Sequence, residues 1–109
     1  MKVIEILSKL KEATNDSIIE VQDTEYEGSC SCTVAATSIY PVVQQSQNKS
    51  IKPIFVVNSG NYHGRQMTME DFRYNATQCS CDEEVVINGE YPVTDVSYNG
   101  LGVVTFYTK

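Results

Sequence analysis

The residues best suited to chemistry are four cysteines, which occur as two copies of the tripeptide Cys-Ser-Cys, at 30–32 and 79–81. Scattered core cysteines rarely produce such a pattern, so we expect the two tripeptides to lie close together. Four thiolates supply the charge and softness that a tetrahedral Zn²⁺ site requires. The candidate metal ligands are therefore Cys30, Cys32, Cys79 and Cys81.

The spacing leaves two other states of these thiols open. Side chains at i and i+2 of a flat strand lie roughly 6 to 7 Å apart, whereas sulfurs that share one zinc through bonds of about 2.3 Å lie closer. Each tripeptide would therefore have to bend to bind metal. Extended tripeptides on neighbouring strands would instead hold the thiols as small buried side chains or as cross-strand disulfides, which an intracellular protein disfavours.

His63 is the only histidine, so a thiol-dependent enzyme would have to combine it with one of the cysteines. It lies in a polar stretch between Gly60 and Gly64, where an exposed histidine without a catalytic role is the simpler interpretation. No Gly-x-Ser-x-Gly, phosphate-binding Gly-Lys or His-Glu-x-x-His motif occurs. The sequence therefore predicts no catalytic or cofactor-binding residue, and zinc is the one cofactor it suggests as an alternative.

Composition favours a single globular domain over residues 1–109. The chain is 41% hydrophobic and 20% charged, which is close to ordinary globular usage. Eight Lys and Arg against fourteen Asp and Glu give a net charge of −6. This charge would repel a phosphate backbone, so direct nucleic-acid binding is disfavoured. It suits a partner protein with a basic surface, although a charge of this size also serves solubility.

No targeting or membrane-spanning segment is predicted. Charged residues at positions 5, 9, 11 and 12 interrupt the apolar stretch that a signal peptide would need. No segment approaches the roughly 20 apolar residues that cross a bilayer. We therefore expect a cytoplasmic protein that does not associate with membranes.

Two helices are predicted. Apolar residues at helical spacing indicate an amphipathic helix over roughly residues 2–14. Its apolar stripe consists of Val3, Ile6, Leu7 and Leu10. Thr68 and Asp71 match the reciprocal capping positions of a second, short helix. The shared face of that helix carries Met69, Phe72, Arg73 and Ala76.

Strands are predicted in the intervening and final segments. A β-branched run indicates a strand over 17–22, and period-two alternation indicates another over 30–37. The apolar run 54–57 is typical of a strand buried on both faces and is the candidate central strand. Two Asn-Gly pairs, at 88–89 and 99–100, match type I′ hairpin turns.

These turns predict a three-stranded antiparallel meander over 84–87, 91–98 and 101–108. Pro92 cannot donate a hydrogen bond in a middle strand, so the first hairpin should be short or bulged there. The predicted fold is α+β, a mainly antiparallel sheet of four to six strands with the N-terminal helix packed on one face and a second short helix. The meander leaves a strand edge that must be covered or paired, which also favours a homo-oligomer.

The two ends of the chain resemble small uncharacterised proteins of bacteriophages and mobile elements. The run from Lys2 to Leu7 with its Lys-Leu-Lys helix, followed by 15–21, is similar to the opening of those proteins. The run 90–98 followed by 102–106 is similar to their closing hairpin. The resemblance implies a phage or prophage origin, and it assigns no activity and no functional residue.

The missing catalytic motifs, the acidic charge and this resemblance together predict a non-enzymatic protein-interaction module of phage or mobile-element type. Such a module would bind a host or phage protein and could inhibit a host defence or regulatory protein. A small zinc-stabilised domain that uses the two Cys-Ser-Cys tripeptides is the second interpretation. A thiol-dependent enzyme is the third.

Overall fold

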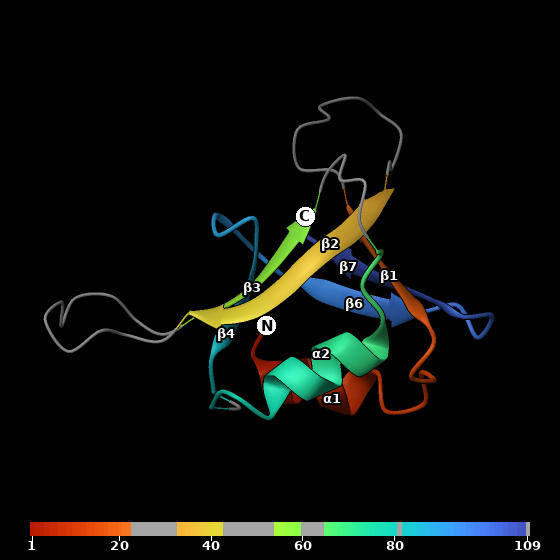
Figure 1. Cartoon of the computed structure of the whole chain (residues 1–109), viewed down its shortest axis with the longest axis horizontal. Helices are drawn as coiled ribbons and strands as arrows, with labels where there is room; N and C mark the ends of the chain where they lie inside the picture. The colour runs from red at the N-terminus through yellow and green to blue at the C-terminus, as the bar shows by residue number, and fades with distance from the viewer. Residues whose placement is uncertain (23–32, 43–53, 60–64, 81, 109) are drawn as a thin grey trace, which may run out of the picture.

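The computed structural model describes residues 1–22, 33–42, 54–59, 65–80 and 82–108, which contain two helices and seven strands. The helices are α1 (Val3–Lys9) and α2 (Met69–Ala76). The strands are β1 (Ile18–Gln22), β2 (Thr33–Val42), β3 (Ile54–Ser59), β4 (Glu84–Ile87), β5 (Tyr91–Pro92), β6 (Asp95–Tyr98) and β7 (Val103–Tyr107). Both helices lie on the same side of the curled sheet (Figure 1).

The seven strands form one mixed sheet in the order β5-β4-β3-β2-β1-β7-β6. Strand β1 pairs in parallel with β7, and β3 pairs in parallel with β4, whereas the other neighbouring pairs are antiparallel. The predicted mainly antiparallel sheet of four to six strands was therefore wrong. Local patterns identify strands but do not specify which distant strands pair, and β1 and β7 come from opposite ends of the chain.

The predicted C-terminal meander is divided after Pro92. Strand β4 has the predicted limits, and Asn88 and Gly89 both have positive φ, at 54° and 72°, as a type I′ turn requires. Strand β5 then contains only two residues, and the chain continues into β6 at the opposite edge of the sheet. The single strand expected over 91–98 is thus two strands that belong to the two edges of a curled sheet.

The second Asn-Gly pair also differs from the prediction. Gly100 and Gly102 have positive φ, at 76° and 89°, but Asn99 does not. The side-chain Oδ1 of Asn99 instead accepts hydrogen bonds from the backbone N–H groups of Leu101 and Val103, at 2.7 and 3.0 Å. The connection between β6 and β7 is therefore a wider loop, stabilised by the asparagine side chain rather than by a type I′ turn.

Both described helices are short. α1 has seven residues, fewer than the predicted range of 2–14, and a turn follows it. α2 begins as predicted, because the backbone N–H of Thr68 donates to the Asp71 carboxylate at 2.8 Å and Thr68 Oγ1 accepts from the N–H of Asp71 at 3.5 Å. Neither of these helices is long and apolar enough to span a membrane.

The core lies between the two helices and the face of the sheet that they cover. Val3, Ile6 and Leu10 of the predicted stripe are buried, while Leu7 is half-buried. The ring of Phe72 from α2 lies 5.0 Å from that of Phe55 on β3 and 5.6 Å from that of Phe106 on β7, measured between centroids. This aromatic cluster joins α2 to both halves of the sheet.

Strand β2, rather than β3, is the middle strand of the sheet. The run 54–57 does supply buried residues on both faces of β3, so its burial was predicted but its central place was not. β2 changes register between Ala36 and Ser38. There the backbone of Met67 bridges β2 and β1, donating to the carbonyl of Ala36 at 2.9 Å and accepting from the N–H of Ile19 at 3.0 Å. This bridge fixes where α2 begins.

Candidate functional site

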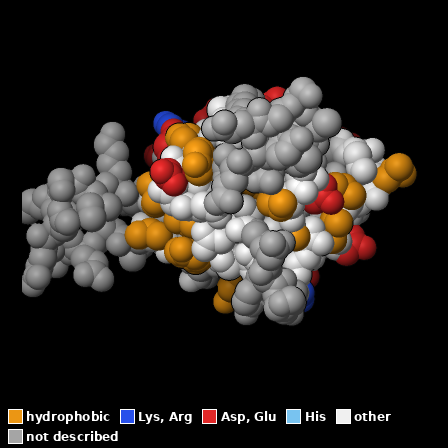
Figure 2. All heavy atoms as spheres, turned by 90° about the horizontal axis from the view of Figure 1, so that it is seen from above, with side chains coloured by type: hydrophobic (Ala, Val, Ile, Leu, Met, Phe, Trp, Pro, Cys, Tyr) orange, Lys and Arg blue, Asp and Glu red, His pale blue; other side chains and the backbone are white. Residues whose placement is uncertain are grey.

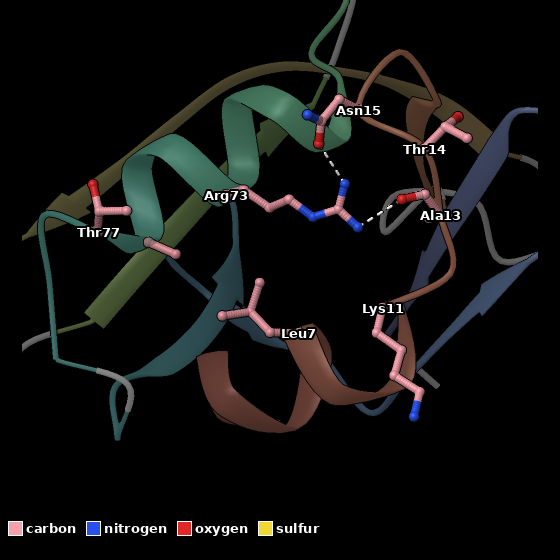
Figure 3. A pocket seen from close by; sticks show the side chains of 8 residues that line it. Leu7, Lys11, Ala13, Thr14, Asn15, Arg73 and Thr77 are labelled. Atoms are coloured by element: carbon pink, nitrogen blue, oxygen red, sulfur yellow. Dashed lines mark hydrogen bonds between the residues drawn. The ribbon is translucent and has the colours of Figure 1, made fainter.

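An open groove of about 820 Å³ lies between α2 and the end of α1 (Figure 3). Ligand pockets commonly have volumes of roughly 300 to 1,000 Å³. Three segments line the groove: the C-terminal part of α1 with its following turn, the connection to β1, and the last turn of α2. The lining residues are Leu7, Lys11, Ala13, Thr14, Asn15, Arg73, Ala76 and Thr77.

The lining combines apolar surface with positive charge. Leu7, Ala13 and Ala76 contribute apolar side chains, and Lys11 and Arg73 contribute two cations. No carboxylate is among the described residues that line the groove. The groove therefore offers an apolar surface beside two positive charges, a composition suited to an amphipathic ligand.

Arg73 extends from α2 toward the segment that follows α1 (Figure 3). Its Nη2 donates to the carbonyl oxygens of Leu10 and Ala13, at 3.1 and 2.6 Å, and its Nη1 donates to Oδ1 of Asn15. Carbonyls beyond a helix end lack helical partners and carry partial negative charge, so a cation stabilises them. Arg73 thus ties the α1–β1 connection to α2, and the same bonds hold its guanidinium in one position.

Backbone bonds join the same two segments near the start of α2. The N–H of Met69 donates to the carbonyl of Ser17 at 2.9 Å, and the N–H of Glu70 donates to the carbonyl of Asn15 at 3.0 Å. These bonds satisfy two N–H groups of the first helical turn, which have no acceptor within the helix. Together with Arg73 they set the distance between the two walls of the groove.

Asp71 holds the segment that precedes α2, because its carboxylate accepts hydrogen bonds from Arg65 and Thr68. Its two carboxylate oxygens accept bonds from Nη2 and Nη1 of Arg65, each at 2.8 Å. The hydrogen bond from the Arg65 side chain, assisted by the bonds from Thr68, holds the pKa of Asp71 below its usual range despite the opposing effect of burial. Asp71 is therefore paired away from the groove and does not neutralise Lys11 or Arg73.

Most of the residues singled out for chemistry lie outside the described part of the chain: Cys30, Cys32, Cys81 and His63. Cys79 follows α2, is half-buried against the core, and its Sγ donates to the carbonyl of Ala76 at 3.6 Å. Among the described residues, no three His, Cys, Asp or Glu side chains form a group that could bind a metal ion. The zinc site and the proximity of the two tripeptides stay predictions.

Glu83 is a buried carboxylate immediately before β4. It is 7% exposed, and its Oε2 has no hydrogen-bond partner among the residues that the structure describes. Its backbone is nevertheless well bonded, because the carbonyl accepts from the N–H of Val3 and the N–H donates to the carbonyl of Ser80. A buried oxygen without a partner lowers stability. Glu83 does not line the groove, so it adds no carboxylate to that site.

The groove was not predicted from the sequence. The sequence pattern placed Arg73 on the shared face of α2. Its charge was the one feature of the sequence that could have indicated the groove, because Met69, Phe72 and Ala76 on that face are buried and uncharged. The other walls come from the connection after α1, which no local pattern marks as functional. A charged residue within an otherwise apolar helix face indicates either a specific polar partner or a candidate site, and here Arg73 has polar partners and also lines the groove.

Comparison with known proteins gave no relative for this chain. No family model matches it, and neither the curated proteins nor the solved structures provide a significant match. The interpretation of the groove therefore depends on its own residues and geometry.

Proposed function

We propose that the chain is a non-enzymatic protein-interaction module that binds a segment of a partner protein in the groove between α1 and α2. The observation that carries this proposal is the groove itself, in which apolar surface from Leu7 and Ala76 adjoins the fixed guanidinium of Arg73. Binding sites typically combine mainly apolar walls with a few oriented polar groups. A side chain that is already ordered also loses less entropy when a ligand binds.

The chemistry of the lining supports binding rather than catalysis. His, Cys, Asp and Glu are missing from the described lining residues, so the hydroxyls there have no adjacent base that could activate them. Thr14 Oγ1 shares a hydrogen bond with Ser17 Oγ at 2.9 Å, and Thr77 Oγ1 donates to the carbonyl of Tyr74 at 2.6 Å. Both hydroxyls therefore take part in local structure.

The resemblance of the two terminal segments to small phage proteins supports a host or phage protein as the partner. In this proposal, occupation of the groove by a segment of a host defence or regulatory protein would block that segment from its normal contacts. The groove supports the proposal that a segment binds between α1 and α2, and the resemblance supports the class of partner.

Selection of random dodecapeptides on immobilised protein tests the binding function. We expect the selection to yield peptides that bind the wild type. Their affinity for the Thr77→Trp variant should be lower by about tenfold or more, roughly 1.4 kcal/mol. The exposed Thr77 lines the groove, so an indole at this position would fill it.

Leu101→Trp is the matched control, because Leu101 is 87% exposed in the β6–β7 loop and does not line the groove. It adds an indole to the surface without filling the site, and it should bind the selected peptides like the wild type. Thermal melts would verify that both variants fold. Peptides that bind the two variants equally well, or the absence of any enriched peptide, would contradict the proposed function.

A further inference from the structure

The charge of the groove differs from that of the chain as a whole. Fourteen acidic residues outnumber eight basic ones, and the surface seen from above in Figure 2 shows acidic side chains at several places but few basic ones. The described lining of the groove nevertheless contains Lys11 and Arg73 and no carboxylate. Solubility explains an acidic surface, but it does not explain a locally cationic groove within it.

Unlike Lys9 and Arg65, the two cations of the groove have no carboxylate partner among the described residues. Lys9 pairs with Asp95, and Arg65 pairs with Asp71. Arg73 instead bonds to neutral oxygens, the carbonyls of the α1–β1 connection and the amide of Asn15. Its positive charge is therefore positioned without being paired with a carboxylate of the described chain.

The hydrogen-bonding capacity of Arg73 is only partly used. A guanidinium has five N–H donors, and three bonds to described acceptors use both donors of Nη2 and one of Nη1. One donor on Nη1 and the donor on Nε are left for a ligand. Lys11, which lines the same groove, is exposed and supplies a second, flexible cation.

We infer that the segment bound in this groove is acidic and amphipathic, with an Asp or Glu carboxylate at the Arg73 guanidinium, where the flexible Lys11 side chain can turn toward it, and an apolar side chain against Leu7 and Ala76. This inference rests on the proposed binding function. It differs from the expectation drawn from net charge, which favours a basic partner surface. The charge of the groove, rather than the net charge of the chain, determines the charge of the segment that binds there. Opposite charges attract across an interface, whereas like charges brought into contact are strongly unfavourable.

The experiment uses the peptides selected on the wild type and a matched pair of variants, Lys11→Gln and Lys9→Gln. Both remove one positive charge from the α1 segment, but only Lys11 lines the groove. We expect the selected peptides to contain Asp or Glu next to an apolar residue. Lys11→Gln should weaken their binding about three- to fivefold, as a partly exposed ion pair predicts. Lys9→Gln should change it less than about twofold, because it alters the overall charge and an exposed ion pair with Asp95 that lies outside the groove.

Replacing the carboxylate of the peptide by an amide, Glu to Gln, completes a double-mutant cycle. The amide peptide should bind the wild type more weakly, and Lys11→Gln should then cause no further loss, because the charge contact is already gone. Additive losses would overturn the inference. Basic or uncharged peptides that bind in a groove-dependent manner would also overturn it while leaving the binding function intact. Failure to obtain any groove-dependent peptide would overturn both.

Discussion

Phe72 and Arg73 are neighbours on α2, yet they belong to two regions of different character. Phe72 is fully buried and contacts the rings of Phe55 and Phe106. Arg73 is half-buried in an open groove and bonds to backbone carbonyls. The first region holds the helix on the sheet through apolar burial, whereas the second positions charge at the surface. Adjacent residues of one short helix therefore have different roles: Phe72 contributes apolar burial, and Arg73 contributes polar bonds beside the groove.

The aromatic core should give the largest effect on stability. Replacing a buried phenylalanine by alanine typically costs about 3 to 5 kcal/mol, and a domain of this size is stable by about 5 to 15 kcal/mol. We expect Phe72→Ala to lower the free energy of unfolding by that amount in a urea titration. Tyr74→Ala is the control, since Tyr74 is 67% exposed and should change stability by less than about 0.5 kcal/mol. Similar losses for both variants would show that α2 does not pack through Phe72.

Replacement of Arg73 should have an intermediate effect on the free energy of unfolding. Arg73→Met keeps an apolar stem in the groove wall but removes the donor of the Ala13 carbonyl and one of the two donors of the Leu10 carbonyl, which also accepts from the N–H of Ala13. We expect a loss of about 1 to 3 kcal/mol in the free energy of unfolding, together with weaker peptide binding. Arg65→Met is a useful comparison, because the side chain of Arg65 is 65% exposed and its salt bridge is screened by solvent. A larger destabilisation by Arg65→Met than by Arg73→Met would contradict the structural role of Arg73.

A smaller effect is expected from pH at the start of α2. The pKa of Asp71 is lowered in the folded protein, chiefly by its hydrogen bond from Arg65. The ionised Asp71 therefore stabilises the fold above the unfolded aspartate pKa of about 3.9, and this contribution is lost as the pH falls through the lower folded pKa. We expect Arg65→Gln to raise the pKa of Asp71 and to reduce the acid dependence of stability.

Carboxyl-carbon NMR titration measures the Asp71 pKa directly in the wild type and in Arg65→Gln. Lys9→Gln serves as the control, because Lys9 bonds to Asp95 instead. An Asp71 that titrates at or above the ordinary aspartate value in the wild type, or whose titration is unchanged by Arg65→Gln, would show that the Arg65 bond does not stabilise the carboxylate.

The parts of the fold predicted correctly are those that neighbouring residues determine. The reciprocal contact of Thr68 and Asp71 starts α2, and the Asn88-Gly89 turn follows β4 at its predicted end. Each depends on residues within a few positions of one another. The burial of the run 54–57 was likewise predicted correctly, because a continuous apolar sequence has no polar face to expose to solvent.

The parts that were missed depend on contacts between distant segments. The parallel pairing of β1 with β7 joins Ile18 to Val103, and no local pattern distinguishes it from an antiparallel neighbour. Pro92 did predict a short first hairpin, but not that the following strand would lie at the other edge of the sheet. The groove arises in the same way, since Leu7 and Arg73 are distant in the sequence and line the same groove only in the folded chain.

The location of the bound segment is the most direct test of the binding face. Backbone amide shifts of the labelled protein would be recorded by NMR during titration with a peptide selected on the wild type. We expect the largest changes within residues 11–15 and 73–77, which contain most of the residues that line the groove, and little change along β6 and β7. Changes concentrated on those strands, with the groove residues unaffected, would contradict binding between α1 and α2.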